Sequence, residues 1–143
     1  MNSKLILFLT RVLMGWMFFY AGITKVLNPN WSAAGYLGNA KTFAGLYNWF
    51  LQPEILPFTN FVNEWGLTLL GVSLIVGALV KYSGYLGALL MLLYYFPVLD
   101  FPKVGANSYL VDDHIIFIAV LLCFVVIKAG EYWGFDGWWK SRR

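Results

Sequence analysis

The chain has 143 residues, of which 60% are hydrophobic, 20% aromatic and only 12% charged, with a formal net charge of +3. A soluble domain of this size must cover a large surface with polar side chains, so the composition excludes that class and predicts an integral membrane protein. A single cysteine, Cys123, and a single histidine, His114, argue against an intramolecular disulfide, a bis-histidine haem and a multi-Cys/His zinc site. We also expect neither a nucleotide site nor a nucleic-acid partner.

Four hydrophobic segments approach the roughly 20 residues that a helix needs to cross a bilayer. They cover residues 5–27, 61–80, 83–99 and 111–129. Pro97 and Pro102 place the end of the third segment near Leu99. Only Lys81 and Tyr82 separate the second segment from the third, which predicts a tight antiparallel hairpin. We therefore predict an all-α fold with one integral membrane domain over residues 1–143, built as a four-helix transmembrane bundle.

The first segment contains the run RVLMGWMFFYAGITK, in which five residues are spaced at successive intervals of four, three, four and three. These residues are Arg11, Gly15, Phe18, Gly22 and Lys25. Such intervals place all five on one helix face, and glycines on that face let a neighbouring helix approach closely. For Arg11 we consider snorkelling to lipid phosphates, a structural ion pair or a ligand contact, and for Lys25 an interfacial anchor or a ligand contact.

Residues 28–57 form an insertion that is too long for an ordinary connection and too apolar for a solvated loop. Its apolar residues recur at roughly helical spacing, Ser32 is placed to cap a helix, and Pro53 prevents continuation. The pattern predicts an amphipathic helix or a broken helix pair that folds over the outer end of the bundle. A plain interfacial helix and a lid over a substrate are both open.

The second segment opens with NEWGLTLLG, where Glu64, Thr68 and Gly71 share one face. Glu64 lies at the same end of the bundle as Lys25, so we expect the two to be close enough to pair. Tyr94 and Tyr95 lie near the end of the third segment, and we expect them at the same outer end of the bundle as Lys25 and Glu64.

The fourth segment opens with YLVDDHIIF, which places Asp112, Asp113 and His114 on the first turn of a helix. One reading is structural, because a carboxylate at this position caps the helix and favours its dipole. The other is functional, because a histidine titrates near neutrality and an adjacent carboxylate such as Asp113 adjusts it for proton delivery.

The cations predict the orientation, because cytoplasmic ends of membrane helices carry an excess of Lys and Arg. With four spans, one side holds two carboxylates, Glu131 and Asp136, and seven cations: Lys4, Arg11, Lys81, Lys128, Lys140, Arg142 and Arg143. The other side holds five carboxylates, Glu54, Glu64, Asp100, Asp112 and Asp113, and three cations, Lys25, Lys41 and Lys103. We predict a multi-pass protein of the cell membrane with both termini in the cytoplasm.

Three parts of the chain resemble the DoxX/DoxD family of small four-helix membrane proteins. The spacing R-x3-G-x2-F-x3-G-x2-K from Arg11 to Lys25 resembles its first helix, and the second-segment start with Glu64 and Gly71 is similar to that family too. The run DDHIIFIAVLLCFVVIKAGEYWGFDGWW looks like the DoxD-type ending, where an Asp-His pair opens the last helix. The Ala-Gly…Gly-x-Asp turn that follows corresponds here to Ala129, Gly130, Gly134 and Asp136.

The resemblance implies a membrane subunit of the thiosulfate:quinone oxidoreductase type, which oxidises thiosulfate to tetrathionate and reduces quinone. In that enzyme DoxD pairs with a smaller subunit, DoxA, so we expect the lipid bilayer and a DoxA-like subunit or a larger enzyme complex as partners. Two alternatives stay open, a non-catalytic accessory subunit packed against a larger membrane enzyme and a small transporter. No inverted repeat with broken helices supports the transporter.

The candidate site follows from polarity and position, not from the resemblance. We predict proton-handling or catalytic roles for His114, Asp113 and Glu64. We predict contacts to substrate or quinone for Lys25, Arg11, Tyr94 and Tyr95.

Overall fold

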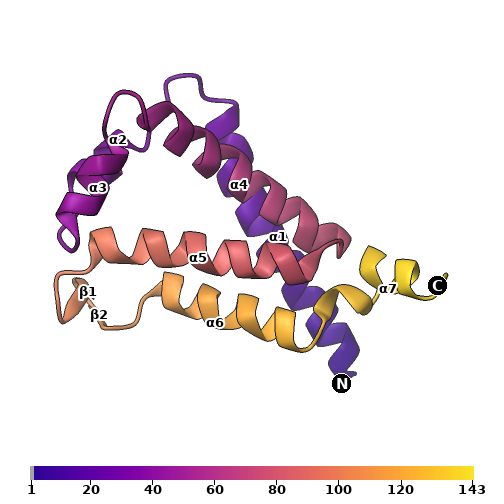
Figure 1. The fold of residues 1–143 in the computed structure, drawn as a ribbon. Coiled ribbons are helices and arrows are strands. Elements are labelled where there is room, and N and C mark those ends of the chain that lie inside the picture. Colours follow the sequence, from indigo (N-terminus) through magenta and orange to yellow (C-terminus); the bar gives the residue numbers. More distant parts are fainter. Residues whose placement is uncertain (1) are drawn as a thin grey trace.

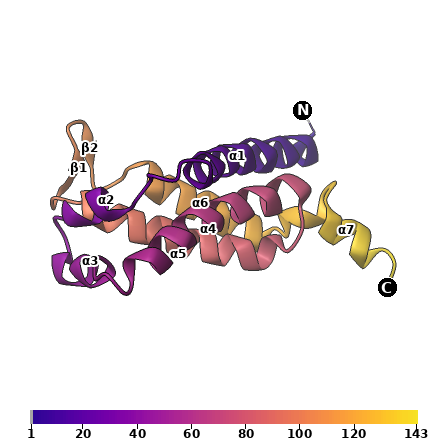
Figure 2. The same ribbon diagram turned by 90° about the horizontal axis from the view of Figure 1, so that it is seen from above.

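The computed structural model describes residues 2–143, and its long helices form two pairs (Figure 1). Helix α1 (Ser3–Val26) packs along α4 (Leu56–Val76), and α5 (Val80–Val98) packs along α6 (Asp113–Val126). Both termini lie at one end of the molecule, which we call the terminal end (Figure 2). That end also carries the 3₁₀ turn η1 (Ala129–Glu131) and α7 (Phe135–Lys140). The opposite end carries α2 (Ala34–Gly38), α3 (Ala44–Phe50) and a small hairpin of β1 (Lys103–Gly105) and β2 (Ser108–Tyr109).

Glycines set the close approach of α1 to α4, as the sequence pattern predicts. A Cβ atom on Gly22 would overlap the backbone and hydroxyl of Thr68, and one on Gly71 would overlap the backbone of Phe19. A Cβ atom on Gly15 would lie 2.9 Å from Leu74 and Ile75. The predicted inward face of α1 is therefore confirmed: Arg11, Gly15, Phe18 and Gly22 are buried, and Lys25 is half-buried.

The turn between α4 and α5 differs from the predicted hairpin at Lys81 and Tyr82. Helix α4 ends earlier, at Gly77, which has a φ of 72° and so adopts the left-handed conformation that ends many helices. Leu79 is also left-handed, and Lys81 lies inside the first turn of α5. The sequence signal was Gly77 itself, since glycine adopts a positive φ without steric cost.

The insertion forms a broken helix pair, which confirms one of its two predicted forms, but it ends before residue 57 because α4 already begins at Leu56. Phe43, with a φ of 55°, separates α2 from α3. The pair lies across the end of α5 that contains Pro97 (Figure 1). Proline has no N–H to donate to the carbonyl four residues earlier, which belongs to Leu93, and the Tyr47 hydroxyl donates to that carbonyl instead at 2.8 Å. Pro97 therefore both ends α5 and provides a docking point for the insertion.

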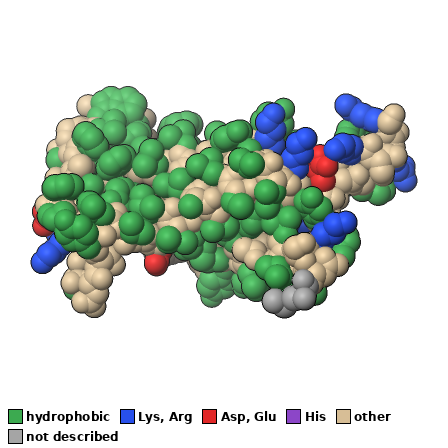
Figure 3. All heavy atoms as spheres, turned by 90° about the horizontal axis from the view of Figure 1, so that it is seen from below, with side chains coloured by type: hydrophobic (Ala, Val, Ile, Leu, Met, Phe, Trp, Pro, Cys, Tyr) green, Lys and Arg blue, Asp and Glu red, His purple; other side chains and the backbone are tan. Residues whose placement is uncertain are grey.

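The outer surface of the helices is strongly apolar (Figure 3). Leu13, Trp16 and Tyr20 on α1 are 57–68% exposed, and Lys and Arg side chains gather toward the terminal end. Among residues 2–143, α1 is the one helix that meets both the length and the hydropathy expected of a membrane span. The 14 residues of α6 rise about 21 Å, which is less than a hydrocarbon core of roughly 30 Å. Each of the four predicted segments thus contains a long helix, although the second ends at Val76 and the fourth covers only Asp113–Val126. Crossing of the bilayer by α4, α5 and α6 is not confirmed.

Candidate functional site

A cavity of about 310 Å³ opens at the end of the bundle that carries α2 and α3, and we call it the ring cavity. Its walls come from α1, the loop after it, α2, α4, α5 and α6. The lining residues are Lys25, Trp31, Ser32, Ala33, Tyr36, Asn63, Tyr94, Val98 and His114. The convergence predicted from the sequence therefore holds for Lys25, Tyr94 and His114.

Lys25 brings a positive charge to this cavity from the last turn of α1. Its ammonium nitrogen lies 5.1 Å from the centroid of the Trp31 ring and 5.7 Å from that of Tyr94, so both rings hold it by cation–π attraction. The salt bridges within residues 2–143 are Lys41–Asp100, His114–Asp112 and Lys140–Glu131, so the expected contact between Lys25 and Glu64 does not form. Glu64 is half-buried on α4 and attracts the ammonium only through space.

His114 is held by Asp112 and not by Asp113. One Asp112 oxygen accepts from the backbone amides of His114 at 3.0 Å and Ile115 at 3.3 Å, which caps α6. The other oxygen lies 2.6 Å from Nδ1 of the His114 ring. This contact leaves Nε2 as the ring nitrogen available to a ligand. Asp113 is exposed, because neighbouring side chains on a helix point about 100° apart, and the predicted His114–Asp113 pair gives way to His114–Asp112.

Tyr94 forms the centre of the site. Its ring lies under Lys25 and meets the His114 ring edge-on at 5.9 Å between centroids. Its hydroxyl donates to Oδ1 of Asn63, whose Nδ2 donates to the Thr59 carbonyl at 2.8 Å. Tyr95 is buried in a separate cluster with Leu99 and Val104, and its hydroxyl donates to the carbonyl of Leu110. The structure therefore does not bring Tyr95 to the cavity.

Sequence reasoning missed Asn63, Trp31 and Tyr36. Asn63 is a buried amide in an otherwise apolar helix, and that was the available signal, because a buried polar side chain needs partners. Trp31 and Tyr36 belong to the insertion, whose path over the bundle depends on contacts with α4 and α5 that no local pattern encodes. Ala33, for example, donates its amide to Asn60 at 2.9 Å.

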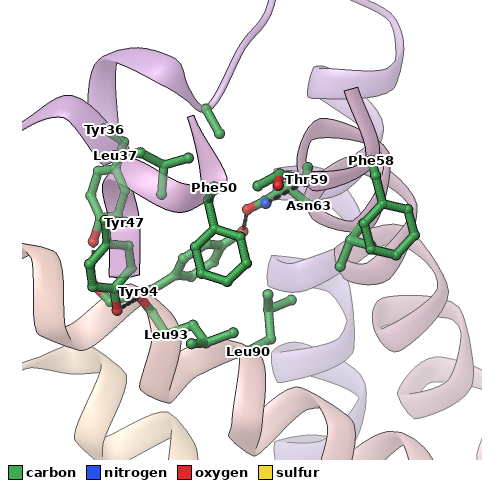
Figure 4. Close-up of a pocket in the computed structure, with 12 residues that line it drawn as sticks. Tyr36, Leu37, Tyr47, Phe50, Phe58, Thr59, Asn63, Leu90, Leu93 and Tyr94 are labelled. Atoms are coloured by element: carbon green, nitrogen blue, oxygen red, sulfur yellow. Dashed lines mark hydrogen bonds between the residues drawn. The ribbon is translucent and has the colours of Figure 1, made fainter. Parts of the chain in front are cut away.

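A smaller cavity of about 100 Å³, which we call the apolar cavity (Figure 4), adjoins the ring cavity. Ala33, Tyr36, Asn63 and Tyr94 line both. The apolar cavity is further lined by Leu37, Tyr47, Phe50, Phe58, Thr59, Val62, Leu90 and Leu93. Burial raises the pKa of Tyr36 and that of Tyr47 to about 12, so both hydroxyls stay protonated and act as donors.

Arg11 lies at the terminal end, far along α1 from these cavities, and its side chain is fully buried. Nη1 donates to the Leu74 carbonyl at 3.0 Å, and Nη2 donates to the carbonyls of Tyr132 and Trp133 at 3.3 and 3.4 Å. The snorkelling interpretation is therefore wrong, and the structure does not bring Arg11 to the ligand cavity. The guanidinium instead joins α1, α4 and the C-terminal segment.

Asp136 completes this terminal cluster, which we define as Arg11, Gly77, Gly130, Gly134 and Asp136. Its carboxylate accepts from the amides of Leu79 at 2.8 Å and Val80 at 3.1 Å, so a residue of α7 caps the start of α5. Gly77, Gly130 and Gly134 provide the space, since a Cβ atom on Gly77 would overlap the Arg11 guanidinium and one on Gly130 would overlap Asp136.

Within residues 2–143, no group of three or more His, Cys, Asp or Glu side chains is placed to hold a metal ion.

A family model described as DoxX matches residues 6–99 of the chain. The match contains Arg11, Lys25, Asn63 and Tyr94 and ends before the residues that position His114. No curated protein and no solved structure matches the chain.

Proposed function

The chain belongs to the DoxX family, and we propose that it is a multi-pass membrane subunit of a quinone-linked oxidoreductase that binds the quinone in its ring cavity. The observation that carries this proposal is that one cavity with aromatic walls is lined both by a half-buried ammonium, that of Lys25, and by an imidazole held by a carboxylate, that of His114.

The proposed topology has α1, α4, α5 and α6 crossing the bilayer with both termini in the cytoplasm. The excess of cations at the terminal end favours this orientation. The ring cavity then lies near the outer surface, beneath the insertion. The apolar outer faces of the helices are suited to lipid contact.

The chemistry of the cavity suits a quinone ring. A quinone has two carbonyl oxygens that accept hydrogen bonds and a flat face that packs on aromatic side chains. Lys25 supplies one donor, and Nε2 of His114 supplies a second when both ring nitrogens carry a proton. Trp31, Tyr36 and Tyr94 supply the rings. The volume lies at the lower end of the range of about 300–1,000 Å³ typical of ligand pockets.

The bound quinone supplies the electron-accepting chemistry, and one quinone takes up two electrons and two protons to become a quinol. In this proposal Lys25 donates a hydrogen bond to one carbonyl oxygen and offsets negative charge that develops there. His114, with both ring nitrogens protonated, delivers one proton from Nε2 while Asp112 holds Nδ1–H, and water at the outer surface supplies the second proton. Thiosulfate is the proposed donor, since two thiosulfate ions release two electrons on forming one tetrathionate, directly or through a DoxA-like partner.

Quinone binding tests the site in protein reconstituted into lipid nanodiscs. Quenching of tryptophan fluorescence by a decyl-benzoquinone gives the affinity. Lys25→Gln and His114→Gln are each expected to weaken it about tenfold, the effect of losing one charge-assisted hydrogen bond. Lys41→Gln is the matched control, because that lysine is exposed at the same end and outside the cavity. Unchanged affinity in both site variants overturns the proposed site.

The proposed reaction is tested by an assay of quinone reduction in native membranes that contain the protein. Thiosulfate-dependent quinone reduction that falls in His114→Gln supports the redox role. Quinone binding without such activity, together with a larger enzyme that co-purifies in fixed stoichiometry, favours the accessory subunit instead.

A further inference from the structure

We propose that the apolar cavity is a subsite for the first part of an isoprenoid tail, so that the site selects membrane quinones over tail-less quinone rings. This inference rests on the proposed function, because it assumes that the quinone ring occupies the ring cavity.

The two cavities form one path. Ala33, Tyr36, Asn63 and Tyr94 line both of them, so a substituent on a ring held beside Tyr94 has the apolar cavity directly next to it. Away from these shared residues the wall consists mainly of Leu37, Phe50, Phe58, Val62, Leu90 and Leu93. A chain of methyl and methylene groups gains free energy there by leaving water.

The polar groups of the apolar cavity are already engaged with the protein. The hydroxyls of Tyr36 and Tyr47 donate to the carbonyls of Tyr94 and Leu93. The Tyr94 hydroxyl donates to the side-chain oxygen of Asn63. The amide nitrogen of Asn63 and the hydroxyl of Thr59 each donate to a backbone carbonyl of α4 or of the residue before it. A ligand that needs hydrogen bonds therefore finds few partners in this cavity, whereas a hydrocarbon segment needs none.

The exit of the cavity lies on α4. Phe58 is 67% exposed and Val62 is 36% exposed, although both line the cavity, so its rim opens on the outer apolar surface of that helix. A tail that fills the cavity continues past Phe58 into lipid. The volume of about 100 Å³ holds only a short segment, so the remaining tail length adds little to the affinity.

The experiment compares two probes, a tail-less benzoquinone and the same ring with a decyl chain, on the wild-type protein and three variants, Val62→Phe, Phe58→Ala and Val72→Phe. Val62→Phe narrows the apolar cavity and leaves the ring cavity intact, because Val62 does not line the latter. Val72→Phe is the matched control on the same helix, as exposed but outside both cavities. Binding is measured by fluorescence quenching in nanodiscs. The readout is the ratio of the two affinities within each protein, so that partitioning of the decyl chain into lipid cancels between proteins.

In the wild-type protein and Val72→Phe we expect the same ratio in favour of the decyl probe. In Val62→Phe that ratio falls at least about fivefold, since displacing even one or two methylene groups has an effect of this size. Phe58→Ala, which removes an exposed rim residue without filling the core, lowers the ratio in the same direction. An unchanged ratio in Val62→Phe and Phe58→Ala overturns the tail subsite while the ring site stands. Failure of both probes to bind the wild-type protein overturns the proposed function itself.

Discussion

Arg11 and Lys25 lie on the same face of helix α1, and the two cations have opposite surroundings. Arg11 is fully buried and donates to three backbone carbonyls from α4 and the C-terminal segment. Lys25 is half-buried, lies against the rings of Trp31 and Tyr94, and faces a cavity. Arginine suits the first place because its planar group offers five donors in a fixed fork, and lysine suits the second because its ammonium can turn toward a ligand.

The comparison separates a structural cation from a candidate ligand-binding one. At the terminal cluster two of the three guanidinium nitrogens are bonded to protein, and only Nε lacks a partner. At the ring cavity the ammonium contacts ring faces, which leaves its N–H groups free to donate to a ligand. A pattern of cations on one helix face therefore does not by itself indicate a site. What decides is whether the protein supplies the acceptors.

The largest expected effect comes from closing the space around Arg11. Gly77→Ala puts a Cβ atom onto the guanidinium at a residue with a φ of 72°. The left-handed backbone alone costs about 1–2 kcal/mol for a residue with a side chain, and the overlap adds to it, so we expect a loss of about 3 kcal/mol or more. Thermal unfolding in detergent measures this. Gly45→Ala is the control, since its Cβ meets no atom within 4 Å, and equal stability of the two variants contradicts the account of the cluster.

The second prediction exchanges the roles of the two cations. Arg11→Met leaves the carbonyls of Leu74, Tyr132 and Trp133 without their donor, which we expect to lower the free energy of unfolding by about 3 kcal/mol. Lys25→Met is expected to change it by less than about 1 kcal/mol, because the side chain is only partly buried and makes no ion pair.

Quinone affinity is the complementary measurement for this pair. Lys25→Met weakens binding at the ring cavity, whereas folded Arg11→Met protein binds normally. The distinction fails if the lysine variant is as unstable as the arginine variant, or if the two lose affinity alike.

Local sequence patterns predicted the parts of this contrast that depend on spacing. The intervals from Arg11 to Lys25 gave the buried face of α1, and Pro97 gave the end of α5. The partners of Arg11 were not predictable in this way, since two of them lie 121 and 122 residues away along the chain. The choice of Asp112 over Asp113 depended on which residue became the N-cap, and a shift of one residue changes the partner of His114.

The third prediction loosens the terminal cluster without touching Arg11. In Asp136→Asn the side chain retains one acceptor oxygen, while the wild-type carboxylate serves the amides of both Leu79 and Val80. We expect a loss of about 1–2 kcal/mol and faster hydrogen exchange at these two amides. Asp100→Asn is the control, because its ion pair with Lys41 is exposed and contributes little. Slow exchange retained at Leu79 in Asp136→Asn contradicts the capping role.

The smallest predicted effect concerns how the insertion is held over the ring cavity. Tyr47→Phe removes the hydroxyl that donates to the Leu93 carbonyl, and we expect a cost of about 1 kcal/mol. In a Pro97→Ala background the new N–H at position 97 can donate to that carbonyl, so the cost of Tyr47→Phe falls by half or more. Tyr36→Phe is the matched control, because Tyr36 donates to the Tyr94 carbonyl, four residues before Val98, which has its own N–H. Its cost is therefore the same in both backgrounds. A double-mutant cycle on thermal unfolding measures the coupling of each tyrosine to Pro97. Equal coupling of both tyrosines contradicts this account, because it shows that the proline acts on the insertion as a whole and not through the carbonyl of Leu93.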